Sequence, residues 1–133
     1  MKIRQRKGID KKLDDAWSEL VKLKAGNKCE YCGADRKVKQ LHSHHIYTRS
    51  NKAGRWNVSN GVALCAGHHV LSSSFSAHKT PVEFTRWLDK YKGIEFMDML
   101  SFKVRQISKL HKFEKEILLN ELKNEINENK ERN

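Results

Sequence analysis

Apolar residues near the start of the chain recur at the spacing of one helix face. They are Leu13, Ala16, Trp17, Leu20 and Val21, and this period of about 3.6 residues predicts an amphipathic helix. Asp10 is a residue type that caps helix N-termini, and the Gly26-Asn27 pair is typical of helix ends. The pattern therefore predicts a helix that begins near Asp10 and stops before Gly26.

The middle of the chain changes to short strands and turns. Residues 29–45 are interpreted as a tight Cys-Glu-Tyr-Cys-Gly turn with two short strands, and residues 40–46 have the clearest strand character. Residues 47–59 form a polar, basic loop. The apolar run Val62-Ala63-Leu64 comes next, and a helix is expected after Cys65.

Helical patterns return after residue 80. The segment Thr80-Pro81-Val82-Glu83 predicts a helix start, because threonine can cap, proline suits the first helical position and glutamate can complete a capping box. Gly93 ends this helix, and residues 94–109 look partly helical. Residues 111–128 predict a charged amphipathic helix whose inward face holds Phe113, Ile117, Leu118, Leu122 and Ile126.

The composition fits one small domain with a helical appendage. Of the 133 residues 38% are apolar and 32% charged, and a small core of this kind often needs a metal or a disulfide for stability. Three cysteines are an odd number, so reduced metal-binding cysteines in a cytoplasmic protein fit better than a disulfide framework. We expect neither a membrane span nor a secretory signal, because no apolar run is long enough.

The net charge of +11 is concentrated in the first 80 residues. Residues 81–133 are nearly balanced, with eleven Lys and Arg against ten Asp and Glu. Lys and Arg that neutralise phosphates release counterions and so supply affinity for nucleic acids. Because the basic excess coincides with the histidine-rich part of the chain, it favours a polyanion partner over a merely solubilising charge.

Two chelating pairs predict a structural zinc site. Cys29-x-x-Cys32 and Cys65-x-x-His68 each place two ligands within reach of one tetrahedral ion, and a Cys₃His set is common in structural zinc sites. A redox-active Cys-x-x-Cys is less favoured, since no βαβ pattern surrounds it. Four protein ligands leave no position for a substrate, so we expect this zinc to clamp the fold.

Six of the seven histidines fall between positions 42 and 78. Apart from His68, they are His42, His44, His45, His69 and His78. Histidine can act as a base near neutral pH, and imidazole binds Mn²⁺, Ni²⁺ or Zn²⁺ well, while Mg²⁺ is also compatible. We interpret His42 as an ordinary strand residue in preference to a partner of the ligands or a phosphate contact.

The stretch from Cys29 to about Leu88 resembles the zinc-containing HNH endonucleases common in phages. The matching segments are Cys29-x-x-Cys32, His44-His45-Ile46, Asn60, Cys65-x-x-His68-His69 and the run from Pro81 to Leu88. The resemblance implies an α+β fold with a zinc-clamped ββα-metal core, flanked by an N-terminal helix and C-terminal helices. It also implies a metal-dependent DNA endonuclease that hydrolyses phosphodiester bonds.

The same resemblance implies roles for individual residues. His45 would be the general base that takes a proton from the attacking water, and Asn60 would orient its imidazole and fix the loop. His44 and His69 would hold one catalytic divalent ion, which could be Mg²⁺, Mn²⁺, Ni²⁺ or Zn²⁺. For His78 a third ligand and a surface histidine are equally favoured.

Three basic residues, Arg49, Lys52 and Arg55, lie in the loop of residues 47–59. In a ββα-metal site this loop lies near the DNA backbone. No acidic residue stands in this part of the chain, so we expect all three side chains to contact phosphates. The competing interpretation, a zinc-stabilised DNA-binding module without catalysis, explains the charge and the cysteines but not the additional histidines.

The sequence predicts three parts: a basic arm and helix at residues 1–25, an HNH core at residues 26–92 and a helical extension at residues 93–133. Residues 84–126 loosely resemble the phage recombination endonucleases of the NinG/Rap type. Homing, DNA packaging and recombination roles, on duplex or branched DNA, therefore all stay open. The final helix can form a homodimer or fold back on the core.

Overall fold

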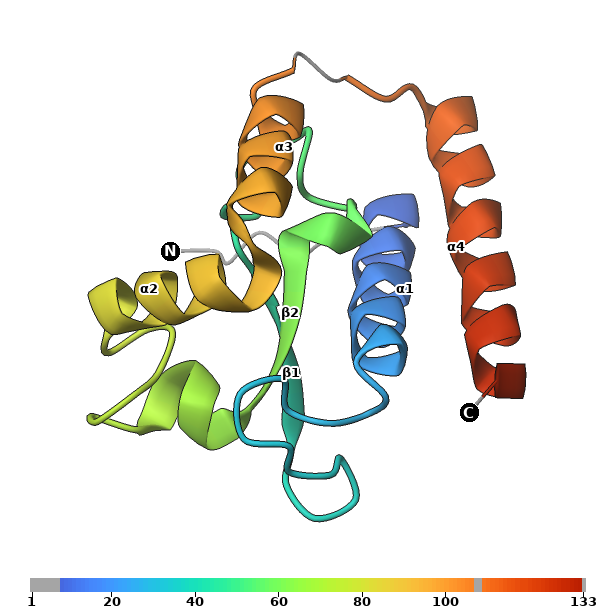
Figure 1. The fold of residues 1–133 in the computed structure, drawn as a ribbon. Helices are drawn as coiled ribbons and strands as arrows, with labels where there is room; N and C mark the ends of the chain where they lie inside the picture. The colour runs from blue at the N-terminus through green and yellow to red at the C-terminus, as the bar shows by residue number, and fades with distance from the viewer. Residues whose placement is uncertain (1–7, 107–108, 133) are drawn as a thin grey trace, which may run out of the picture.

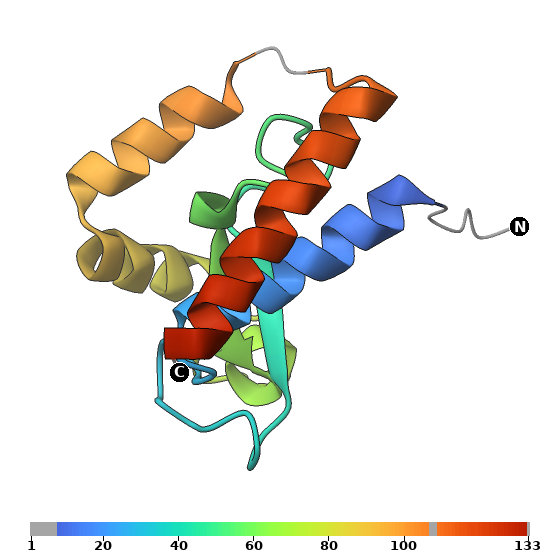
Figure 2. The same ribbon diagram turned by 90° about the vertical axis from the view of Figure 1, so that its right-hand side faces the viewer.

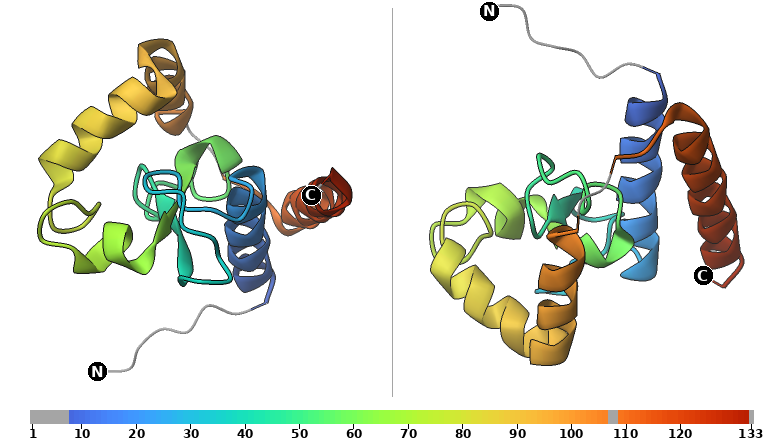
Figure 3. Two further views of the ribbon diagram at one scale, coloured as in Figure 1. Left: turned by 60° about the horizontal axis from the view of Figure 1, so that its bottom comes forward. Right: turned by 90° about the horizontal axis from the view of Figure 1, so that it is seen from above.

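A computed structural model describes residues 8–106 and 109–132 of the chain. Its elements are α1 (Ile9–Lys24), β1 (Leu41–His45), a 3₁₀ turn η1 (Val58–Asn60), β2 (Gly61–Cys65), a π-helical turn η2 (Gly67–Leu71), α2 (Pro81–Lys92), α3 (Ile94–Val104) and α4 (Lys112–Arg132). The strands lie between α1 on one side and α2 and α3 on the other, while α4 covers the outer side of α1 (Figures 1 and 3). The expected α+β fold with flanking helices is confirmed.

The two strands form an antiparallel hairpin in which Leu41 pairs with Cys65 and His45 pairs with Gly61. The prediction of two strands within residues 29–45 is wrong. The described residues before β1 form turns with a single bridge between Lys28 and Asp35. The second strand is instead the apolar run after Asn60, which is buried at every position because helices cover it.

Side chains alternate along β1, and this alternation decides which histidines meet. His42 and His44 lie on one face of the strand, and Ser43 and His45 lie on the other, toward α1. The strand thus divides adjacent histidines between two environments.

Helix α1 packs between the hairpin and α4. Trp17 and Val21 belong to the core around β2, whereas the opposite side of the helix meets α4 in a second cluster of Leu13, Ala16, Leu20, Leu119 and Leu122. A side chain at Gly61 would lie 2.5 Å from Cγ2 of Val21. The close approach of β2 to α1 therefore requires glycine at this position.

Helix α4 lies across α1 and packs against it (Figure 2). Its buried side chains are Leu119 and Leu122, with Leu118 and Ile126 partly buried beside them. The prediction that Phe113 and Ile117 point inward is wrong, since they are 63% and 53% exposed. The reason is that α1 covers only one stripe of α4, and these two side chains lie outside it.

Two predicted helix starts differ in detail from the structure. Helix α1 begins at Ile9, so Asp10 lies in its first turn and forms an ion pair with Lys115 of α4. The hydroxyl of Thr80 donates to the carbonyl of Ser76 and accepts from its N–H, and it makes no capping bond to α2. No helix in the described part of the chain has the length and apolar character needed to cross a membrane.

Candidate functional site

Four side chains converge where the turn after α1 meets the end of β2. The sulfur atoms of Cys32 and Cys65 lie 3.9 Å apart. Nδ1 of His68 lies 3.3 Å from the sulfur of Cys65 and 3.9 Å from that of Cys29. All four ligand atoms lie within 4.8 Å of one another, as the two chelating pairs predict.

This Cys₃His set fits a tetrahedral zinc ion. With zinc–sulfur bonds of about 2.3 Å, the edges of such a tetrahedron measure about 3.8 Å between sulfurs and about 3.5 Å between sulfur and nitrogen. Burial favours the protonated thiol of Cys29, but backbone N–H groups, that of Cys32 first, lower its pKa overall and favour the thiolate that a metal needs. The cluster can hold zinc and leaves no free ligand position.

Three further histidines converge on the other side of the π-helical turn. Nε2 of His69 lies 3.1 Å from Nδ1 of His44 and 3.2 Å from Nε2 of His78. Ligands on one ion at metal–nitrogen distances of about 2.1 Å stand about 3.0 Å apart in octahedral and about 3.4 Å apart in tetrahedral geometry. The set can therefore hold one ion, and its three ligands leave positions open for a substrate.

Burial and the neighbouring histidines keep the imidazoles of His44 and His69 neutral. Burial first, and then the proximity of His69, His78 and His45, lowers the pKa of His44 to about 3. Burial, followed by His78 and His42, lowers the pKa of His69 to about 4. Neutral imidazoles present the lone pairs that a metal ion binds.

His45 faces the opposite side of β1 and is held by two contacts. Its imidazole stacks on Trp17 with ring centroids 3.7 Å apart, and its Nε2 lies 2.9 Å from the carbonyl oxygen of Arg55. A carbonyl oxygen can only accept, so Nε2 carries the proton and donates. This leaves the lone pair on Nδ1, the form that a general base requires.

Asn60 is fully buried beneath the loop that follows β1. Its Oδ1 accepts from the N–H of Tyr47, and its Nδ2 donates to the carbonyls of Tyr47 and Gly54. A side chain on Gly54 would lie 2.9 Å from that Nδ2. Asn60 thus fixes the loop that follows His45 at Tyr47 and at Gly54, while the imidazole itself donates to the carbonyl of Arg55.

Residues 29–74 match the family model of the HNH endonucleases. The matched segment contains both strands, the Cys₃His set and the residues His44, His45, Asn60 and His69. We refer to this matched segment, residues 29–74, as the HNH domain. The other two comparisons found no matching curated protein and no matching solved structure.

The site extends beyond residues 29–74, the segment that matches the HNH family. His78 follows that segment, and Trp17 and Asp14 precede it. Sequence reasoning missed both α1 residues, because only the tertiary packing of α1 brings them to the loop. The spacing of Trp17 within an apolar stripe indicates a core residue, which is also true, since it is 2% exposed.

The interpretation of His42 as an ordinary strand residue is wrong. Its Nδ1 lies 2.8 Å from Nδ1 of His69, on the side of that ring away from His44 and His78. The contact fixes how the ring of His69 is turned, so that Nε2 faces the other two histidines. The signal in the sequence was the two-residue spacing of His42 and His44, which places both on one face of the strand.

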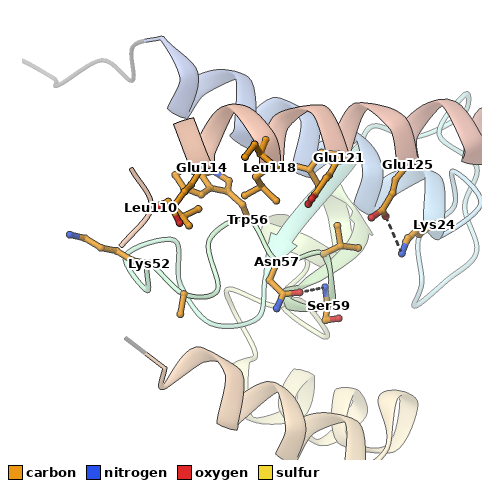
Figure 4. Close-up of a pocket in the computed structure, with 14 residues that line it drawn as sticks. Lys24, Lys52, Trp56, Asn57, Ser59, Leu110, Glu114, Leu118, Glu121 and Glu125 are labelled. Carbon is orange, nitrogen blue, oxygen red and sulfur yellow. Dashed lines mark hydrogen bonds and ion pairs between the residues drawn. The ribbon is translucent and has the colours of Figure 1, made fainter. Parts of the chain in front are cut away.

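The three basic residues of the HNH-domain loop lie in different surroundings. Arg49 lines a cavity of about 440 Å³ beside His45. Lys52 lies at the edge of a groove between the loop and α4 (Figure 4). Arg55 is turned inward, where Nε and Nη2 bind the carboxylate of Asp14 at 3.0 and 2.8 Å. The loop itself contains no acidic residue, and the carboxylate that pairs with Arg55 comes from α1.

Proposed function

We propose that this protein is a metal-dependent DNA endonuclease that hydrolyses phosphodiester bonds. The observation that carries the proposal is the open set of His44, His69 and His78 at the end of the strand that also holds His45. A closed zinc site and a basic surface would suffice for a DNA-binding module. Such a module has no use for a second, incomplete ligand set whose strand also carries an imidazole with its lone pair on Nδ1.

His45 is the proposed general base. Its Nδ1 would take the proton from a water molecule that attacks the phosphorus atom, and the hydrogen bond from Nε2 to Arg55 would stabilise the resulting imidazolium. Burial lowers the pKa of His45, whereas its hydrogen bond to Arg55 and the charge of Asp14 act in the opposite direction. The imidazole is therefore neutral at physiological pH and able to accept a proton.

His44, His69 and His78 are the proposed ligands of the catalytic ion, with Mg²⁺, Mn²⁺, Ni²⁺ and Zn²⁺ as candidates. When bound, a divalent ion would neutralise charge on a phosphate oxygen and on the leaving 3′ oxygen. Because His44 and His45 are consecutive residues at the end of β1, a phosphate at the strand end can lie between ligand and base.

DNA is the partner that both the family and the charge support. Residues 29–74 match the family model of the HNH endonucleases, and the chain has a net charge of +11. Arg49 beside His45 and Lys52 on the same loop are the proposed phosphate contacts. Arg55 is no longer among them, since its guanidinium is engaged by Asp14 and its accessible fraction is 21%.

The test is DNA cleavage by the full chain, loaded with zinc, on supercoiled plasmid, linear duplex and four-way junction DNA in each divalent ion. We expect at least one ion to support cleavage, and His45→Ala to abolish it while zinc content and DNA binding stay at the wild-type level. His111→Ala is the matched control, because His111 is exposed at the start of α4 and away from both ligand sets.

Two results would contradict the proposal. Cleavage by His45→Ala at the wild-type rate would remove the proposed base. DNA binding without cleavage of any substrate in any ion would favour the zinc-stabilised binding module. A preference for the junction over the plasmid would assign the activity to branched DNA.

A further inference from the structure

Helix α1 contacts the proposed base although it lies outside the segment that matches the HNH family. The indole of Trp17 stacks on the imidazole of His45 with an angle of 7° between the ring planes. The same indole donates from Nε1 to the carbonyl of Asn57 at 2.8 Å. Trp17 is therefore fixed at its polar end and presents a rigid face to His45.

A second connection runs from α1 through Asp14. This carboxylate is 7% exposed and receives Nε and Nη2 of Arg55. It also accepts from Nε1 of Trp56 at 2.8 Å. Three donors from two consecutive loop residues thus meet one carboxylate, which fixes the backbone of that part of the loop relative to α1.

The carbonyl of Arg55 is the group that accepts the hydrogen bond from His45 Nε2. The ion pair and the hydrogen bond therefore use the side chain and the backbone of a single residue. A shift of Arg55 away from Asp14 would displace this carbonyl and release the imidazole. The side-chain Nδ2 of Asn60 donates to the carbonyl of Gly54, the residue before Arg55, and holds this part of the loop as well.

We propose that α1 is the positioning element for the general base, with Asp14 acting through Arg55 and Trp17 acting by direct stacking. This inference rests on the proposed function of His45. Neither α1 residue takes part in proton transfer. Their effect is to select the imidazole orientation in which Nε2 donates to the loop and Nδ1 stays available.

A matched control exists on the same helix. Glu19 forms a two-point pair with Arg36, with both oxygen–nitrogen distances at 3.0 Å, and lies on the surface away from His45. Asp14→Asn and Glu19→Gln each remove one carboxylate that binds a guanidinium at two points. Only the first removes a carboxylate that is connected to His45.

The first readout is independent of catalysis. A histidine ring N–H that is hydrogen-bonded in a protected place exchanges slowly with water, so its proton gives an NMR signal in a ¹⁵N-histidine-labelled chain. We expect such a signal from Nε2 of His45 in the zinc-loaded wild type, assigned by its loss in His45→Gln. Asp14→Asn should lose or broaden it, and Glu19→Gln should keep it.

The second readout is the split between kcat and KM for DNA cleavage. Misplacement of a reacting group by about 1 Å can reduce the rate by up to about 100-fold. Asp14→Asn and Trp17→Leu should therefore lower kcat by roughly 10- to 100-fold and leave KM unchanged. Glu19→Gln should leave both constants unchanged.

An unpaired Arg55 can prevent Asp14→Asn from folding, so a double variant, Asp14→Asn with Arg55→Gln, removes the positive charge as well. We expect it to fold, to hold zinc and still to lack the His45 signal. Wild-type signals and kcat in a folded variant that lacks the Asp14 carboxylate would overturn the proposal. A wild type that shows the signal but cleaves nothing would contradict the nuclease function and leave the positioning by α1 supported.

Discussion

His68 and His69 are consecutive residues that face two different ligand sets. Nδ1 of His68 points toward Cys29 and Cys65, and Nε2 of His69 points toward His44 and His78. Both residues lie in the π-helical turn η2, and π-helical turns are frequent at functional sites. This turn presents adjacent imidazoles in different directions, so a change at His68 should act through the fold and a change at His69 through the site.

The contact between His42 and His69 leads to a prediction about metal affinity. If His69 binds an ion through Nε2, its Nδ1 carries the proton and donates to Nδ1 of His42. We expect His42→Ala to weaken binding of the second divalent ion by roughly 10- to 100-fold. Titration calorimetry with Mn²⁺ or Ni²⁺ on the zinc-loaded chain measures this, and an unchanged affinity would show that the contact has no orienting effect.

The lowered pKa of His44 predicts a pH dependence of stability. The unfolded chain protonates this residue near pH 6.5, whereas the folded chain resists protonation down to about pH 3. Between these values the unfolded state binds more protons than the folded state. The contribution of His44 to the free energy of unfolding is therefore complete above pH 6.5 and is lost as the pH falls.

As the pH falls from about 6.5 to about 4.5, the free energy of unfolding of the wild type should therefore decrease by about 1.4 kcal/mol more per pH unit than that of His44→Gln. The free energy of unfolding is measured on zinc-loaded protein with no other divalent ion added. Equal slopes in the two proteins would mean that His44 is not protected from protonation.

At the scale of elements, α1 connects the strand hairpin to the C-terminal helix α4. One side of α1 contributes Trp17 and Val21 to the core of the hairpin, and the other packs on α4. Ion pairs from Asp10 to Lys115 and from Lys24 to Glu125 lie near the two ends of this contact. Partly exposed ion pairs contribute little, so the leucine cluster supplies most of the stability.

We therefore predict that Leu122→Ala lowers the free energy of unfolding by about 2–5 kcal/mol, because Leu122 is 4% exposed within this cluster. Ile117→Ala on the same helix is the control, since Ile117 is 53% exposed. Its effect should stay within about 0.5 kcal/mol. Chemical denaturation measures both, and equal losses would contradict the packing of α4 on α1.

The periodic elements and the zinc ligands could be predicted from the sequence, and the other contacts between elements could not. The apolar stripe of α1 and the proline at the start of α2 are local signals, and the chelating spacings brought Cys29, Cys32, Cys65 and His68 together correctly. The pairing of β1 with the run after Asn60 was missed, because short apolar segments do not specify their partners. The pair between Asp14 and Arg55 spans 41 positions, and only the packing of α1 creates it.

At the scale of the whole molecule, the uneven charge predicts how binding to DNA should depend on salt. The excess positive charge lies in residues 1–80, which include the HNH domain, whereas residues 81–133 are nearly balanced. A side chain that neutralises one phosphate contributes about 0.9 to the slope of log Kd against log salt concentration. The slope therefore reports which residues touch the DNA backbone.

We expect Arg49→Gln to reduce this slope by about 0.9, because Arg49 lines the cavity beside His45. Lys123→Gln, an exposed position on α4, is the control and should leave the slope unchanged. Binding isotherms at several salt concentrations measure both. A reduced slope for Lys123 with none for Arg49 would place the DNA on the wrong side of the molecule for cleavage at His45.

We propose that two metal sites with different tasks meet at His68 and His69, and one variant tests this division most directly. In His69→Ala, zinc content and DNA cleavage are measured on the same purified sample. We predict about one tightly bound zinc per chain, as in the wild type, together with complete loss of cleavage. Cleavage at the wild-type rate, or loss of the zinc along with the activity, would contradict the division of the two histidines between two sites.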